Sequence, residues 1–223
     1  MVRRPFAWRR LLATLALAMT GAVILTGCDT DAPAPSGDAL YADAEQTYLE
    51  YREFVNGVQS VLSTDPWTIG QIGRYGMQPG SCDGDTGYQF DLGRTLQLGR
   101  TLQMDAADRD ANAEAVTRHL EEAGLSPRQR TLGDGDKSLV QVAVRDEGGF
   151  ELLLVEFGYD GTVRVSATTA CRPGDALALS DLIFGDVRFL GGYLPDDVEA
   201  PTDPLFFGIT PGDPQFVRET PAP

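Results

Sequence analysis

The second half of the chain constrains the fold most, because three of its segments have the residue pattern of β-strands joined by tight turns. These segments are residues 140–145, 150–157 and 163–169. In the first and third, apolar side chains occupy every second position, which places them on one face of a strand. The middle segment is apolar almost throughout, as suits a central strand covered on both faces. Asp146-Glu-Gly-Gly and Tyr159-Asp-Gly separate the segments as turns, so the pattern predicts an antiparallel meander.

Two earlier segments have the period of an amphipathic helix. In residues 40–63 and 106–124, apolar side chains recur every three or four positions and charged residues occupy the opposite face. Asp65-Pro66 ends the first segment and Gly124 ends the second. The stripe of the first helix carries three tyrosines, Tyr41, Tyr48 and Tyr51. Such a stripe could line a site for a sugar or an aromatic ligand, but it more often packs in a core, which is the interpretation we favour.

Shorter patterns complete the predicted domain. Residues 88–92 and 128–132 have the composition of further strands, and residues 177–184 suit one short helix. We expect a single α+β domain over residues 40–190, with an antiparallel sheet of four to five strands and two main helices packed on one face. Residues 191–223 are rich in proline, and their phenylalanines indicate a tail that packs in part on the body.

A tandem repeat follows the predicted strand at residues 88–92. The sequence Leu-Gly-Arg-Thr-Leu-Gln occurs at residues 92–97 and again at residues 98–103. Because its length is an even number of residues, the repeat keeps alternate side chains on the same face and would lengthen a strand or a hairpin. Two copies are too few for a repeat architecture, which needs about three. We interpret it as a local duplication.

The first 27 residues have the parts of an export signal. Residues 1–10 contain four arginines, and residues 11–25 are uncharged and apolar, shorter than the roughly 20 residues that span a membrane. The segment ends in Leu25-Thr26-Gly27-Cys28, which resembles the lipobox of bacterial lipoproteins. The resemblance implies that residues 1–27 are removed and that a diacylglyceryl group on the Cys28 thiol anchors the chain. The alternative is an uncleaved signal anchor with an incidental cysteine.

A lipid on Cys28 would hold the domain at the extracytoplasmic face of the cell membrane. Residues 28–39 contain two prolines and no apolar period, so they form a flexible tether. At full extension such a tether reaches no more than about 35–40 Å. Arg3-Arg4 also resembles a twin-arginine signal, a pair common in basic leaders, so the general and the twin-arginine export routes both stay open.

The chain has three cysteines, and the lipid would consume one of them. Cys82 and Cys171 remain, and an oxidising compartment favours a disulfide between them. A zinc site is the competing interpretation, but the chain has no Cys-x-x-Cys and a single histidine, His119. The bridge would close a loop of about 90 residues and contribute about 4–5 kcal/mol on the chain-entropy account. Strand parity continued to residue 171 predicts that the bridge is buried.

The order of these segments, with Thr169-Ala170-Cys171-Arg172-Pro173 after the last strand, is similar to that of small uncharacterised envelope lipoproteins of high-GC Gram-positive (actinobacterial) bacteria. The resemblance covers roughly residues 40–185, and the lipobox is its specific motif. It implies a location and a fold. It brings no known activity.

Charge limits the partners. The chain has 18 basic and 33 acidic residues, and removal of the four leader arginines leaves 14 basic residues and a formal charge of −19. A field of this sign repels phosphate backbones, so we expect no nucleic-acid partner. The charge mainly favours solubility.

We find no motif for a nucleotide, a catalytic serine or a zinc-bound water, and we predict no catalytic residue, no metal and no cofactor. Asp108-Arg-Asp110-Ala-Asn112 begins like a calcium loop but lacks its glycine and its last glutamate, so helix capping explains its acids better. Asp83-Gly-Asp85 and Asp134-Gly-Asp136 are turns first and calcium candidates second.

Two functional hypotheses follow from these observations. The first is a non-enzymatic binding or accessory module of the cell envelope, anchored in the membrane through its lipid, that engages a protein, a glycan or a small ligand. The second is a cell-wall hydrolase or transferase that uses paired acidic residues. With 33 acids the chain offers many pairs, and only their separation in space is informative. We favour the first because the sequence shows no nucleophile with its base.

Overall fold

The structure is a computed structural model, and its described residues are 33–69, 76–84, 86–98, 104–185 and 198–208. Backbone contacts divide the chain into two units, residues 1–33 and 34–223, and the fold below is that of the second unit. The predicted leader and Cys28 lie outside the described residues.

The helices fall close to where the sequence places them. They are α1 (Gly37–Leu62), α2 (Ala106–Glu122) and α3 (Ala176–Phe184), with a short 3-10 helix, η2 (Gly135–Lys137). The Asp105 carboxylate caps α2 by accepting a 2.8 Å hydrogen bond from the backbone N–H of Asp108, and Asp175 caps α3 in the same way. No helix in the described ranges is both long and apolar enough to cross a membrane.

One antiparallel sheet contains every strand of the described chain. The long strands are β3 (Gly87–Gln97), β4 (Arg128–Leu132), β5 (Leu139–Glu147), β6 (Phe150–Phe157) and β7 (Thr162–Thr169). The short strands are β1 (Trp67–Ile69), β2 (Pro79–Cys82), β8 (Arg172–Pro173) and β9 (Val198–Glu199). The strand order is β4-β5-β6-β7-β3-β1-β9, and β2 and β8 also pair with β3.

The α+β class and the antiparallel meander β5-β6-β7 are therefore confirmed. The predicted size of the sheet is wrong, since it has nine strands rather than four to five. Besides the two main helices, the predicted short helix, α3, also packs on the sheet. The missed strands have two to four residues each. A strand that short has no measurable period, so only pairing with a neighbour creates it.

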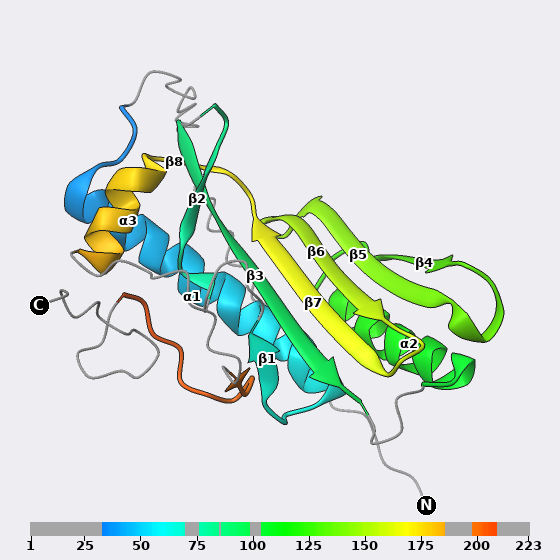
Figure 1. The fold of residues 1–223 in the computed structure, drawn as a ribbon. Coiled ribbons are helices and arrows are strands. Elements are labelled where there is room, and N and C mark those ends of the chain that lie inside the picture. Colours follow the sequence, from blue (N-terminus) through cyan, green and yellow to red (C-terminus); the bar gives the residue numbers. More distant parts are fainter. Residues whose placement is uncertain (1–32, 70–75, 85, 99–103, 186–197, 209–223) are drawn as a thin grey trace, which may run out of the picture. The chain divides into compact units, whose positions relative to one another are not determined.

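The sheet buries one of its faces. Figure 1 shows α1 and α2 crossing the same side of strands β3 to β7. The strand side chains that face these helices are almost all apolar and buried, among them Phe90, Val142, Val155 and Val165. Tyr48 and Tyr51 of α1 are buried in this core, as favoured from the sequence, while Tyr41 is half-buried against Phe207. No described helix covers the opposite side, here called the open face.

Helices α1 and α2 meet where a glycine faces a histidine. A Cβ atom on Gly57 of α1 would lie 3.5 Å from Nε2 of His119 on α2, which is ordinary contact. The His119 ring also lies beside Phe54, with 6.4 Å between the ring centroids. The single histidine is therefore a packing residue at a helix crossing.

The first copy of the tandem repeat extends β3. Leu92, Arg94 and Leu96 alternate on the buried face, so the copy lengthens the strand to Gln97 as its even period allows. Apart from Leu98, the second copy lies outside the described residues.

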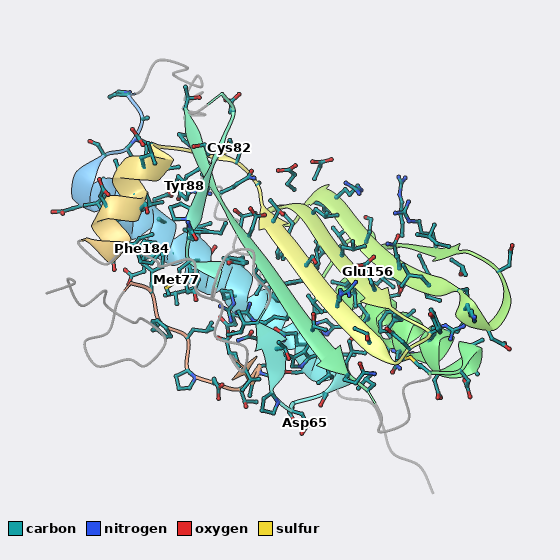
Figure 2. All side chains as sticks on the ribbon, in the orientation of Figure 1. Asp65, Met77, Cys82, Tyr88, Glu156 and Phe184 are labelled. Atoms are coloured by element: carbon teal, nitrogen blue, oxygen red, sulfur yellow. A yellow bond between two sulfur atoms is a disulfide. The ribbon has the colours of Figure 1, made fainter. Side chains whose placement is uncertain are left out.

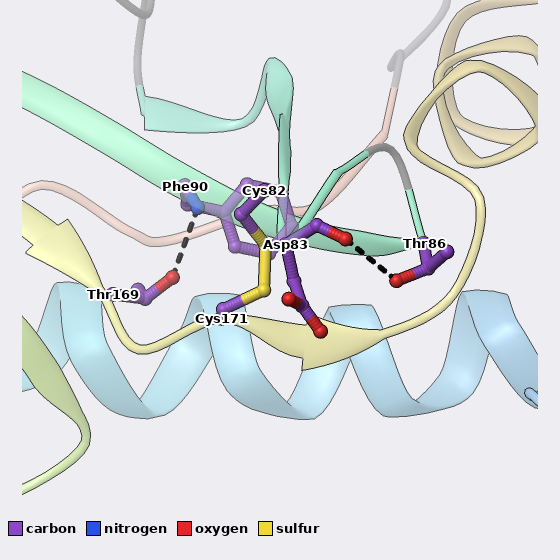
Figure 3. The surroundings of a disulfide bond; sticks show 6 residues. All are labelled: Cys82, Asp83, Thr86, Phe90, Thr169 and Cys171. Carbon is purple, nitrogen blue, oxygen red and sulfur yellow. Dashed lines mark hydrogen bonds between the residues drawn. A yellow bond between two sulfur atoms is a disulfide. The ribbon is translucent and has the colours of Figure 1, made fainter.

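Cys82 and Cys171 form the predicted disulfide (Figure 3). It joins the end of β2 to the segment before β8, and Gly87 of β3 lies against both sulfur atoms. The predicted burial is wrong, because Cys171 is exposed and Cys82 is half-buried. Strand β7 ends at Thr169, so its alternation of buried and exposed side chains does not continue to residue 171. At this end, Oγ1 of Thr169 accepts a 2.9 Å hydrogen bond from the N–H of Phe90.

Two glycine substitutions test this packing. We expect Gly57→Ala to raise the free energy of unfolding by up to about 1 kcal/mol, because alanine is the better helix former and its Cβ fits. Gly87→Ala should lower it by about 1–3 kcal/mol, because a Cβ there would lie 2.5 Å from the Cys171 sulfur. Urea unfolding of the oxidised protein measures both. Equal destabilisation by the two changes would contradict the packing described.

Candidate functional site

The open face carries polar side chains arranged in rows across the strands. In one row, strand pairing aligns Arg130 of β4 with Gln141 of β5, Glu156 of β6 and Arg164 of β7. In the next row it aligns Arg128 with Ala143, Leu154 and Ser166. Paired residues of antiparallel strands point to the same side, so each row forms a line of neighbouring side chains.

A chain of hydrogen bonds fixes the first row. Nε of Arg130 donates to Oε1 of Gln141 at 2.5 Å, and Nε2 of Gln141 donates to Oε1 of Glu156 at 2.6 Å. Gln141 is buried between its two partners, and Glu156 is labelled on the sheet in Figure 2. The Arg130 side chain is thereby held against the sheet, while the residue as a whole stays exposed.

The second row contains a hollow. It has a volume of about 510 Å³, and eight residues line it: Ser126, Arg128, Arg130, Ala143, Arg145, Asp146, Glu147 and Leu154. Ala143 and Leu154 pair with each other in the register of the strands and both line the hollow, where the Ala143 side chain is much shorter than those of the arginines. We call this site the basic hollow.

Some charged groups of the basic hollow have hydrogen-bond partners and others form no ion pair among the described residues. Glu147 accepts two hydrogen bonds from Ser126, from its N–H at 2.9 Å and from its Oγ at 3.1 Å. The ion pairs found among the described residues involve other arginines, and Arg128 and Arg145 are both exposed. Among the described residues, the three arginines of the hollow form no close ion pair, and they outnumber its two acids, Asp146 and Glu147.

This arrangement suits an anion. A guanidinium group is a planar fork that donates paired hydrogen bonds to a carboxylate or a phosphate, and it stays charged at every physiological pH. Three such groups around a small apolar floor can hold an anionic group against the sheet.

A second cluster of charges is buried beneath the opposite end of the sheet. Arg52 of α1 and Arg94 of β3 both bind Oε2 of Glu199 on β9, at 2.7 Å and 2.5 Å. Arg52 also donates to the Tyr48 hydroxyl at 3.0 Å, and Tyr51 donates to the carbonyl of Gly76 at 2.5 Å. Both arginines are at most 1% exposed, so this cluster pins a short strand rather than receiving a ligand from solvent.

The pKa of Glu199 reflects two opposing effects. Burial acts to raise it, but attraction and hydrogen bonds from Arg52 and Arg94 outweigh burial and leave the pKa below the ordinary 4.5. The carboxyl group is therefore ionised in the folded protein at neutral pH. Within the described residues, Arg52 and Arg94 share the one carboxylate of Glu199, so its loss should destabilise the cluster.

A third polar cluster lies beside the disulfide. Asp43 of α1 accepts hydrogen bonds from Arg172 of β8 and from the Tyr88 hydroxyl of β3, the latter at 2.6 Å. The hydrogen bond from Arg172 holds the pKa of Asp43 below its ordinary value, although burial opposes it. Burial and the hydrogen bond to Asp43 raise the pKa of Tyr88 to about 12. These contacts tie three elements together at the bridge.

The calcium and zinc sites considered from the sequence are not formed by the described residues. Asp108 and Asp110 lie in the first turns of α2, where Asp105 caps the helix. Asp134 and Asp136 lie at η2, and Asp83 turns β2 into β3 while Asp85 lies outside the described residues. In the described part of the chain, no three His, Cys, Asp or Glu side chains converge as a metal site would require. The zinc interpretation of the cysteines is wrong, because they are bonded to each other.

In comparisons with known proteins, no family model, no curated protein and no solved structure matches this chain.

The basic hollow was not predicted from the sequence. Its signal was present in Arg128-Gln-Arg130, where two arginines occupy one face of a short strand, and in Arg145, which follows the three buried valines of β5. The net charge of −15 describes the whole molecule and conceals a local excess of the opposite sign. The pairing of β4 with β5 is what brings the three arginines together.

Glu199→Gln tests the buried cluster. Removing the anion takes away the carboxylate that Arg52 and Arg94 share, so we expect the free energy of unfolding at pH 7 to fall by about 3 kcal/mol or more. Because the folded pKa of Glu199 is lowered, its contribution is complete above about pH 4.5 and is lost as the pH falls through the folded value.

Urea unfolding between pH 7 and pH 3 measures this contribution. The difference between wild type and Glu199→Gln should shrink as the pH falls below 4.5. Glu151→Gln is the matched control, because Glu151 is exposed on β6 and its loss should leave stability unchanged. A difference that is absent at pH 7, or that does not change with pH, would contradict the cluster's role.

Proposed function

We propose that this chain is a lipid-anchored binding module at the extracytoplasmic face of the cell membrane, and that its binding site is the basic hollow. The leader and the Leu25-Thr26-Gly27-Cys28 motif support the location. The disulfide between Cys82 and Cys171 agrees with an oxidising compartment. The tether keeps the domain near the bilayer.

One observation carries the proposed binding. Arg128, Arg130 and Arg145 surround a hollow of about 510 Å³ on a sheet face that no described helix covers. Pockets that bind ligands combine an apolar floor with a few polar groups that fix orientation, and this one has both. The chemistry of its polar groups selects an anionic partner.

We do not extend the proposal to hydrolysis. A glycosidase needs one carboxylic acid with a raised pKa beside a second carboxylate. Asp43 and Glu199, the described carboxyl groups with a shifted pKa, both have it lowered by arginine. The alternative of an acid-based cell-wall enzyme therefore gains no support from them.

Palmitate labelling tests the anchor. Cells that express the chain are grown with radiolabelled palmitate. The protein is then extracted from membranes, and its intact mass is measured by mass spectrometry. We expect label on the wild type, a mature chain that begins at Cys28, and neither in Cys28→Ala, because the thiol is the acceptor. An unlabelled chain of full length in the cytosol would overturn the proposed location.

Titration with citrate and pyrophosphate tests the basic hollow. We expect both anions to shift the backbone amide NMR signals of β4 and β5, and the shifts to weaken as salt rises. The triple variant Arg128→Ala/Arg130→Ala/Arg145→Ala should lose them. Arg118→Ala is the control for the loss of an exposed arginine, because it removes one positive charge from the exposed side of α2. Equal binding by the triple variant would show that the anion site lies elsewhere.

A further inference from the structure

The basic hollow lies beside a free edge of the sheet. Strand β4 is the last strand in the order, pairs with β5 on one side, and has no described strand on its other side. All five of its residues are exposed. The backbone N–H and C=O groups on its outer side therefore face solvent, as a template for one more strand.

The arginines of β4 make a second copy of this chain a poor occupant of the edge. If two β4 strands paired antiparallel about their middle residue, Arg130 would lie directly opposite its own copy. Like charges directly opposite each other destabilise a strand pair. The same charges stabilise a strand of opposite sign.

We propose that the partner of this site is a polypeptide, and that an extended segment with acidic residues at alternate positions pairs with β4 as an additional strand. This inference rests on the proposed function and names its ligand class. Arg128 and Arg130 are two residues apart on one face, about 7 Å along the strand. Acidic side chains at alternate positions of a neighbouring strand have the same spacing as Arg128 and Arg130 and can lie on the same face of the sheet.

The two parts of this interaction have different roles. Backbone hydrogen bonds to β4 supply affinity for any extended chain, and the arginines select the acidic one. The overall negative charge of the protein does not prevent this, because at physiological salt charges are screened beyond about 8 Å and the nearest groups decide. Two acids, Asp146 and Glu147, also line the hollow, but its three arginines outnumber them.

A set of capped peptides tests the inference on the full lipid-anchored chain. The probe is Glu-Val-Glu-Val-Glu-Val with a fluorescent label, and the charge control is Lys-Val-Lys-Val-Lys-Val. Two further probes carry N-methyl groups on alternate backbone amides, one on the glutamates and one on the valines. These keep every charge but remove the donors from one edge of the peptide.

We expect the acidic peptide to bind and the lysine peptide not to bind. Arg128→Ala/Arg130→Ala should weaken binding at least about fivefold, in line with two exposed charge pairs. Arg118→Ala should not weaken it. One of the two methylated peptides should bind at least about tenfold more weakly than the parent, because it loses the hydrogen bonds to the β4 backbone.

The remaining outcomes separate the two proposals. If both methylated peptides bind like the parent, the acids bind the hollow without strand pairing and the inference is overturned. If citrate or pyrophosphate binds and the acidic peptide does not, the anion site stands and the polypeptide partner is wrong. If none of these probes binds the wild type, the inference and the proposed function both fail.

Discussion

The burial of one face of the sheet determines the rest of this structure. Strands β3 and β5 to β7 place apolar side chains at every second position, and α1 and α2 cover those side chains. Because the period is two, each buried residue is followed by one that points to the uncovered side. Val142 and Val144 are buried in this way, and Ala143 between them lines the basic hollow. The core and the candidate site are thus two faces of the same strands.

The two faces differ in how their arginines are placed, since some are buried in ion pairs and others are exposed. Arg52 and Arg94 are buried with Glu199 at one end of the sheet, where they join α1, β3 and β9. Desolvation of three charges is costly, and it is repaid only by close ion pairs and hydrogen bonds. Arg128 and Arg145 at the other end are exposed and have no such partner among the described residues. The first pair is held within the fold, whereas the second is the one that we propose binds a ligand.

The sequence predicted what depends on local period and missed what depends on pairing. The meander, the three helices and the cysteine pair followed from spacing, turn residues and composition. Four short strands were missed because they exist only through their neighbours. Burial of Cys171 was wrongly predicted because β7 ends two residues before it. The basic hollow was missed because the register of β4 against β5, which aligns Arg130 with Gln141, is not visible in one strand alone.

The central claim is that Arg52 and Arg94 are buried and structural, whereas Arg128 and Arg145 are exposed at the proposed binding site. Modification with phenylglyoxal, read residue by residue by mass spectrometry, tests it most directly, since the reagent reacts only with accessible guanidinium groups. The account predicts rapid modification of Arg128 and Arg145, and protection of Arg52 and Arg94 until the protein unfolds. Modification of all four at the same rate in the folded protein would contradict it.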